Sequence, residues 1–266
     1  MDRNRKGARS AKDIPDDIMA QLNAGQIESA NLVEWLAIDQ LSLLKGFLEQ
    51  ADRNQYLAPV INRIEQLKKK SVNTLNEAIG TELLSLARQH SDDDLFSFMA
   101  QHPADMVRCW AAYFVGGNDE LSINAKLTRI QPFAADRHFG VREVGWIAVR
   151  PTIIQQLSPA IDILAKWTSS SDTNIRRFAS EATRPRGVWC PHIEELKQNP
   201  ALALSILEPL KSDSARYVQD SVGNWLNDAS KTQPEFVVNL CQKWTTESPT
   251  KETAYIVKKA LRALNK

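Results

Sequence analysis

Apolar positions recur at helical spacing along most of the chain. The stretch "SANLVEWLAIDQLSLLKGFLEQ" begins at Ser29 and repeats its apolar residues every three to five positions, at Leu32, Trp35, Leu36, Leu41, Leu44 and Leu48. Either Ser29 or Asn31 can cap the start of this segment. The stretches "YLAPVINRIEQLKKK" and "SVNTLNEAIGTELLSLARQH" continue the pattern. The pattern predicts a series of amphipathic helices that begins at Ile14.

The second half of the chain contains an internal repeat. Its copies are "HPADMVRCWAAYFVG" (102–116), "DRHFGVREVGWIAVRP" (136–151), "SDTNIRRFASEATRP" (171–185) and "SDSARYVQDSVGNWLND" (212–228). They align on Val107, Val141, Ile175 and Val218, with separations of 34, 34 and 43 residues, and a fainter copy starts at Ser248. Other helical stretches, such as "PALALSILEPL", lie between the copies.

Two helices per unit at this period predict an all-α fold, an α-solenoid of HEAT-like or armadillo-like repeats. One helix pair cannot bury its apolar face alone, so the units are expected to stack into a curved superhelix. The second helix of each unit would then line a concave surface. A low glycine count, 10 in 266 residues, also favours helices. The domain prediction is a flexible basic tail over residues 1–13, followed by one repeat domain over 14–266.

Charge and cysteine content narrow the classes of function. The net charge is only +1, yet seven arginines and one lysine lie from Arg137 to Arg186, so a local phosphate-binding face is expected. The three cysteines form no CxxC pair, which indicates reduced thiols in a cytoplasmic protein. Cys190 and His192 offer two metal ligands without a third nearby, so no metal site is predicted. No apolar run approaches the roughly 20 residues of a membrane span.

Candidate chemistry gathers near the end of one repeat helix, in "SEATRPRGVWCP" (180–191). This stretch combines Glu181, Arg184, Arg186 and Trp189 around a helix break at Pro185. In the repeat alignment, Glu143, Glu181 and Asp228 come from the second helices of three consecutive units. These three carboxylates are therefore expected to converge on the concave surface. Trp146 and Trp225 lie on the same set of helices, and Arg150 aligns with Arg184.

Each of these residues also has a purely structural interpretation. Glu181 is four residues after Arg177 and three before Arg184, a spacing that supports ion pairs within a helix. Asp228 can cap a helix turn, the tryptophans can fill the core, and the arginines can form a solvated face. The sequence leaves these alternatives open.

Several motifs together resemble the AlkC branch of the HEAT-like DNA alkylation-repair glycosylases. They are "HFGVREVGWIAVRP", "SEATRPRGVWC" and "YVQDSVGNWLNDASKTQPE". The earlier stretch "LNAGQIESANLVEWLAIDQ" is similar to the opening helices of that family. The resemblance runs from about Ile14 to the C-terminus. It implies cleavage of the N-glycosidic bond of alkylated bases in double-stranded DNA, typically 3-methyladenine and in some members 7-methylguanine.

The resemblance also implies roles for individual residues. Glu143, Glu181 and Asp228 match the active-site carboxylates, and Glu181 is the first choice for the group that positions the water. Trp189 and Trp146 would contact the lesion, and Arg150, Arg184 and Arg186 would contact phosphates. No metal or organic cofactor and no obligate protein partner are expected, and the protein would act as a monomer.

The chain departs from the family pattern in two motifs. It has "VREVGW" where "VREWAW" is expected, which places Val144 and Gly145 at the variable positions. It has "RPRGVWC" in place of "RPRLPWG", with Gly187 in the loop before Trp189. These changes keep two alternatives open. One is a related protein that binds damaged or branched DNA without cleaving it, and the other is a protein-interaction scaffold.

Overall fold

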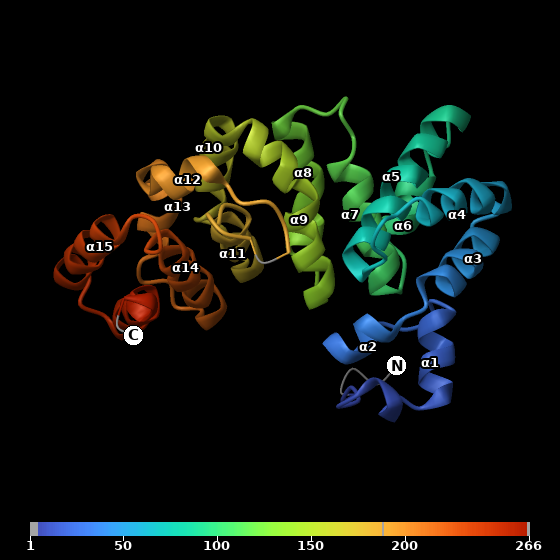
Figure 1. Ribbon diagram of the computed structural model, residues 1–266, viewed down its shortest axis with the longest axis horizontal. Coiled ribbons are helices and arrows are strands. Elements are labelled where there is room, and N and C mark those ends of the chain that lie inside the picture. Colours follow the sequence, from blue (N-terminus) through green and yellow to red (C-terminus); the bar gives the residue numbers. More distant parts are fainter. Residues whose placement is uncertain (1–4, 188, 265–266) are drawn as a thin grey trace. The chain divides into compact units, whose positions relative to one another are not determined.

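A computed structural model describes residues 5–187 and 189–264 of the protein. Within these ranges every regular element is an α-helix or a short 3-10 helix, and none is a strand (Figure 1). The all-α prediction is therefore confirmed, and so is the HEAT-like solenoid class. Among the helices of these ranges, none is long and apolar enough to cross a membrane.

The described chain forms two compact units, and the boundary between them falls within helix α9 (Phe139–Gln155) after Ala148. Unit 1 comprises residues 5–120 and 136–148. Its helices are η1 (Ala11–Asp13), α1 (Asp16–Asn23), α2 (Leu32–Ala37), α3 (Gln40–Gln50), η2 (Asn54–Tyr56), α4 (Leu57–Glu65), α5 (Val72–His90), α6 (Leu95–Ala100), α7 (Asp105–Gly116) and the first part of α9. Helix α5 packs against α7 in this unit.

Unit 2 comprises residues 121–135 and 149–264. Its helices are α8 (Ile123–Ala134), the rest of α9, α10 (Leu157–Trp167), α11 (Thr173–Ala182), α12 (Glu194–Gln198), η3 (Pro200–Ala203), α13 (Leu204–Leu207), η4 (Glu208–Leu210), α14 (Arg216–Ala229), α15 (Pro234–Glu247), α16 (Lys251–Ala260) and η5 (Leu261–Ala263). Helix α14 packs between α11 and α16 (Figure 1). The single-domain boundary of 14–266 stays a prediction.

The four aligned repeats correspond to α7, α9, α11 and α14. Their anchor residues Val107, Val141 and Val218 are fully buried, while Ile175 is partly exposed. The fainter copy from Ser248 corresponds to α16. The repeat alignment therefore placed one helix at each of its four copies, and the structure has a helix at each of these places.

The turn before each of these four helices is closed by a side chain within the turn. In each turn a side-chain atom accepts a hydrogen bond from the backbone N–H two residues later. The acceptors are His102 Nδ1 (from Ala104), Asp136 Oδ1 (from His138), Ser170 Oγ (from Asp172) and Asp213 Oδ1 (from Ala215), at 2.7–3.2 Å. The repeats therefore share a turn geometry although the capping residue changes.

The side chain six residues after each capping position holds the same turn from the helix. Arg108, Arg142 and Arg176 each donate from Nη1 to the two carbonyl oxygens of their turn, at 2.7–3.1 Å. Gln219 takes this position in α14 and donates to the Asp213 carbonyl at 2.7 Å.

Two of these arginines also reach the turn of the following repeat. Arg108 pairs with Asp136 at 2.8 Å, and Arg176 pairs with Asp213 at 2.6 Å. We call this set of contacts, from Arg108, Arg142, Arg176 and Gln219, the turn ladder.

The N-terminal segment is held more firmly than the sequence predicts. Arg5 forms an ion pair with Glu34 at 2.5 Å and donates to the Glu28 carbonyl, and Asn31 donates to the Ala8 carbonyl. Residues 1–4 lie outside the described residues. From Arg5 onward the predicted flexible tail is bonded to α2 and to the turn before it.

The first predicted amphipathic segment divides into α2 and α3. Asn31 caps α2 by accepting from the Glu34 N–H, whereas Ser29 bonds Asp105 instead. Residues Leu32, Leu36 and Leu41 are about half exposed, at 55%, 54% and 45%. The break at Ile38 and Asp39 rotates α3 out of register with α2, so one apolar stripe does not continue through both helices.

The turn ladder predicts a large stability difference between two arginines of unit 1. Arg108 is buried and bonds Asp136, Glu28 and the turn carbonyls, so Arg108→Ala leaves buried acceptors unpaired. We expect the free energy of unfolding in urea to fall by about 3 kcal/mol or more. Arg137 also pairs with Glu28 but is 72% exposed, so Arg137→Ala is the matched control and should cost less than about 1 kcal/mol. Equal losses in the two variants would contradict the role assigned to the ladder.

Candidate active site

Two of the three predicted carboxylates meet at one arginine in unit 2. Arg184 follows the end of α11 and donates from Nη1 to Glu181 Oε1 at 2.8 Å. The same guanidinium donates from Nε and Nη2 to Asp228 Oδ2, at 2.9 and 2.6 Å. Glu181 lies on α11 and Asp228 on α14, so Arg184 joins carboxylates from consecutive repeats. Both carboxylate residues are only 4% exposed.

Glu181 remains ionised although it is buried. Burial alone would raise the pKa of the Glu181 carboxyl, but Arg177 and Arg184 outweigh it and bring the pKa below its ordinary value of 4.5. Arg177 approaches Glu181 Oε2 at 3.5 Å, and the Ser221 hydroxyl donates to the same oxygen at 2.7 Å. Both oxygens of the carboxylate are therefore held by donors.

Asp228 and Arg184 complete the cluster. Lys231 donates to Asp228 Oδ1 at 3.0 Å, and Arg186 Nε donates to the Asp228 backbone carbonyl at 3.3 Å. Burial lowers the pKa of Arg184, but the two carboxylates outweigh it and raise the pKa, so the guanidinium is charged at neutral pH. The cations around the two carboxylates leave a surplus of positive charge.

Arg150 anchors the segment that follows α11. Its side chain is fully buried and donates to three backbone carbonyl oxygens, those of Pro191, Ala182 and Arg184, at 2.9, 2.8 and 2.6 Å. The Arg150 guanidinium points into the protein. This geometry favours a role in anchoring the segment and does not favour the predicted phosphate contact. Burial lowers the pKa of Arg150, and the three carbonyls compensate for its lost hydration.

The anchored segment carries Trp189. This side chain is 76% exposed, more than any other large apolar side chain of the described ranges. Its neighbour Val188 lies outside the described residues. Because the Ile193 N–H bonds the Pro185 carbonyl at 3.0 Å, both ends of the segment are fixed while the indole faces solvent. An exposed indole on a fixed base is available to stack on a planar ligand.

Glu143 and Trp146 form a pair of their own in unit 1. The Trp146 indole N–H donates to Glu143 Oε2 at 2.9 Å, one turn apart on α9. Trp146 is 5% exposed and Glu143 is partly exposed. The convergence of Glu143 with the two carboxylates of unit 2 stays a prediction, and so does a lesion contact by Trp146.

A second polar cluster in unit 1 has the composition of a hydrolase triad but a different order of contacts. Ser29 Oγ lies 3.1 Å from His138 Nε2 and donates to Asp105 Oδ2 at 2.9 Å. His138 Nδ1 accepts from the Gly140 N–H at 3.1 Å and lies 3.4 Å from the same Asp105 oxygen. The serine proton is therefore directed at the carboxylate, whereas in a catalytic triad it is directed at the histidine.

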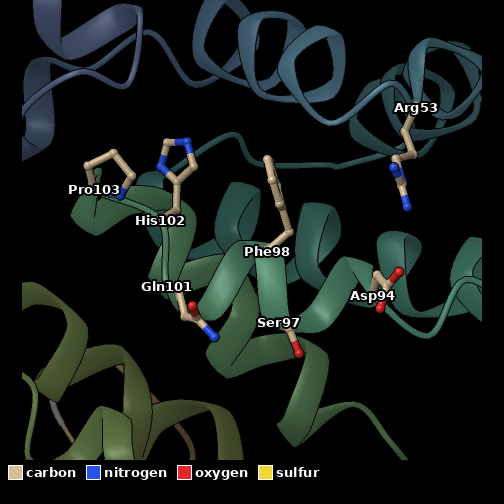
Figure 2. A pocket seen from close by; sticks show the side chains of 7 residues that line it. All are labelled: Arg53, Asp94, Ser97, Phe98, Gln101, His102 and Pro103. Atoms are coloured by element: carbon tan, nitrogen blue, oxygen red, sulfur yellow. The ribbon is translucent and has the colours of Figure 1, made fainter.

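Unit 1 also contains a hollow of about 520 Å³, which is lined by none of the predicted site residues. Figure 2 shows the Phe98 ring projecting into this space, with Arg53 and His102 on either side of it. Burial lowers the pKa of His102 to about 4, so its imidazole is neutral at pH 7. Within 5–187 and 189–264, no three His, Cys, Asp or Glu side chains group as a metal site.

Comparisons with known proteins agree on one family. Residues 145–264 match the DNA alkylation repair enzyme family. The protein YhaZ of Bacillus subtilis is 40% identical over 119 residues, which cover 45% of this chain and 33% of YhaZ. The chain therefore spans about a third of that curated relative.

Two solved structures share the fold. The alkylpurine DNA glycosylase AlkC of Pseudomonas fluorescens, bound to DNA containing an abasic site analog, superimposes with a TM-score of 0.68 and 25% identity. That match covers 85% of this chain and 61% of AlkC. AlkD2 of Streptococcus mutans matches with a TM-score of 0.58 and 24% identity, over 78% of this chain and 97% of AlkD2.

The fold is that of the HEAT-like proteins AlkC and AlkD2. Residues 145–264, a little under half of the chain, match the DNA alkylation repair enzyme family, and the resemblance to AlkC-type proteins inferred from the motifs is confirmed.

The structure adds one contact to Glu181 that the sequence did not single out, the hydrogen bond from Ser221. The helical spacing of Arg177 and Glu181 indicated a second contact, and the Arg177 guanidinium also lies over the Tyr217 ring, 4.4 Å from the centroid. Nothing in "YVQDSVGNW" distinguishes Ser221 from any other serine of a helix interface.

The lowered pKa of Glu181 predicts how stability depends on pH. A carboxyl whose folded pKa is depressed contributes stability above its unfolded pKa, and loses it as pH falls through the folded value. In Glu181→Gln this contribution is absent. We expect the stability gap between wild type and Glu181→Gln to be widest at neutral pH and to shrink below pH 4.5. Urea unfolding at pH 7, 5, 4 and 3 measures the gap, and a constant gap would contradict an ionised Glu181.

The anchoring role of Arg150 predicts a local change in protection. Arg150→Lys keeps the charge but cannot reach three carbonyls at once, so the backbone from 184 to 193 should open more often. Hydrogen–deuterium exchange of peptides over this segment should rise about tenfold or more, while peptides of α5 stay unchanged. Unchanged exchange in 184–193 would contradict the anchor.

Proposed function

We propose that the protein is a DNA glycosylase of base excision repair that removes cationic alkylated bases. The main substrate proposed is 3-methyladenine in double-stranded DNA, and 7-methylguanine is proposed as a further substrate. It hydrolyses the N-glycosidic bond as a monomer, without a metal or organic cofactor. One observation carries the proposal: within the segment that matches the repair family, Arg184 joins Glu181 and Asp228, and the segment after α11 presents Trp189 to solvent.

The chemistry of the substrate suits ionised carboxylates. Alkylation at N3 gives adenine a positive charge, which already weakens the glycosidic bond. The enzyme then has to stabilise an oxocarbenium-like sugar and position a water molecule. Glu181 supplies a carboxylate that is ionised at neutral pH, and Asp228 is the second proposed carboxylate. Glu143 is the third proposed carboxylate.

The tryptophans and arginines suit the other parts of the substrate. An indole face attracts a cationic base by about 0.5–2 kcal/mol, the role proposed for Trp189 and, in unit 1, for Trp146. Arg184 and Arg186 provide charge for phosphates, which bind without sequence preference. A phosphate that engages Arg184 competes with its two carboxylates and frees one oxygen of each.

One observation favours a second candidate, a protein that binds damaged DNA without cleaving it. Glu181 and Asp228 are almost fully buried, and all four carboxylate oxygens are bonded in this structure. If Arg184 keeps these contacts when DNA binds, neither carboxylate can reach a water. The basic residues around them would still bind phosphates.

Base release from methylated genomic DNA separates the two candidates. Wild type should release 3-methyladenine above a no-enzyme control when the products are separated by chromatography. Glu181→Gln should lower the single-turnover rate by about a hundredfold or more, with DNA affinity by fluorescence anisotropy retained. Glu194→Gln is the control, because its side chain is 68% exposed and pairs only with neighbours on the surface of unit 2.

Two outcomes would overturn the glycosylase. Salt-dependent DNA binding by wild type without release of any base would leave the non-catalytic candidate. No appreciable affinity for DNA at moderate salt would leave a protein-interaction scaffold, because the arginines then have no phosphate partner.

A further inference from the structure

We propose that Ser221 is a positioning residue that orients the Glu181 carboxylate for reaction. The inference rests on the proposed function and deepens it, because it assigns different tasks to the two oxygens of Glu181. Ser221 holds Oε2 inside the protein, and Oε1 is the oxygen that serves the nucleophilic water.

The contact is built by two neighbouring helices. Ser221 lies on α14 and is 2% exposed, and its hydroxyl donates to Glu181 Oε2 on α11 at 2.7 Å. The Ser180 hydroxyl, fully buried on α11, donates to Ser221 Oγ at 2.8 Å. The two serines and the carboxylate therefore form a short chain of hydrogen bonds across the interface of α11 and α14.

The direction of this chain follows from the carboxylate at its end. Glu181 is ionised and can only accept, so the single hydroxyl proton of Ser221 is directed at Oε2. Ser180 Oγ lies 2.8 Å from Ser221 Oγ and 3.0 Å from the Arg177 carbonyl, and its own proton serves one of these two acceptors.

The two oxygens of Glu181 consequently differ in whether their hydrogen-bond donor can be displaced when a ligand binds. Ser221 is a short, buried side chain on a packed helix, and its hydroxyl lies 2.7 Å from Glu181 Oε2. Arg184, which holds Oε1, extends from the residues after α11 and is shared with Asp228. A DNA phosphate can draw Arg184 away from Oε1, whereas nothing in the substrate competes for Ser221. Oε1 is therefore the oxygen that becomes available.

Glu181 faces several charged and titratable groups besides Ser221. Those that act on it, from its own helix and from the elements around it, are Arg177, Arg184, Asp228, Arg150 and Cys190. The hydrogen bond from Ser221 favours the charged form of the carboxyl, so it acts in the same direction as Arg177 and Arg184 on the pKa of Glu181. Its removal raises that pKa while the other groups stay in place.

Two alanine variants of equal burial test the inference. Ser221→Ala removes the donor to Glu181, and Ser180→Ala removes a hydroxyl of the same interface that does not touch the carboxylate. We expect Ser221→Ala to lower the single-turnover rate of base release by about tenfold to a hundredfold, with affinity for DNA containing an abasic site unchanged. The acid limb of its pH–rate profile should move to higher pH. Ser180→Ala should release base at a single-turnover rate within about threefold of wild type, and its pH–rate profile should not shift.

Several outcomes would overturn the inference. If the two variants lose rate equally with unshifted pH profiles, the serines only pack the interface. If Ser221→Ala matches wild type, Glu181 does not depend on it.

A second measurement separates failure of the inference from failure of the proposed function. The carboxyl signal of Glu181, assigned with Glu181→Gln in ¹³C-glutamate-labelled protein, should titrate at higher pH in Ser221→Ala than in wild type. If wild type releases no base, the glycosylase is wrong, and this titration still decides whether Ser221 holds the carboxylate. An unshifted titration would contradict that contact.

Discussion

The structure depends on a hydrogen-bonded turn that is held from the helix that follows it. In three of the turns one arginine bonds two carbonyls, in the fourth Gln219 bonds one, and Arg108 and Arg176 also reach the next turn. These donors pair turn carbonyls with a partner on the following helix, which stabilises each turn. Arginine suits this position because its planar group supplies several donors in a fixed geometry.

The same principle of shared donors governs the candidate site. Two buried carboxylates on neighbouring helices would repel each other if no cation lay between them. Arg184 between them, with Arg177 and Lys231 at the sides, keeps the pKa of Glu181 low and satisfies the oxygens of both groups. The site is therefore assembled with its ion pairs already made. Under the proposed function, the first step with DNA would be an exchange of arginine partners rather than an ionisation.

The fold could be predicted from the sequence because the same helical pattern of apolar residues recurs in several repeats, and each copy supports the others. The spacing of Val107, Val141 and Val218 located three buried helices, and the polar turns before them marked their starts. The sequence could not show that Ile38 and Asp39 separate α2 from α3, because both halves keep helical spacing. It also could not show that Arg5 is bonded to Glu34, because a basic segment with few apolar residues is typical of a free tail.

The sequence predicted which residues form the site better than it predicted the contacts that their side chains make. Residues Glu181, Arg184 and Asp228 were chosen because they occupy related positions in consecutive repeats, and the structure joins them. Arg150 occupies the position of Arg184 in the preceding repeat, yet its guanidinium turns inward to three carbonyls. Alignment gives the place of a residue on its helix but not the rotamer of a long side chain. For the same reason Ser221 could not be singled out, since its importance comes from a contact with Glu181 on the neighbouring helix.

The uneven repeat length has an evolutionary consequence. The ladder bond from Arg108 to Asp136 spans 28 residues, whereas the equivalent bond from Arg176 to Asp213 spans 37, and both close with similar geometry. The nine additional residues lie between the helix end and the next turn, in the connection that carries Trp189. Insertions at this place leave the scaffold intact, so natural selection can lengthen, shorten or replace the segment independently of the helices. New ligand preferences can arise there without a loss of folding.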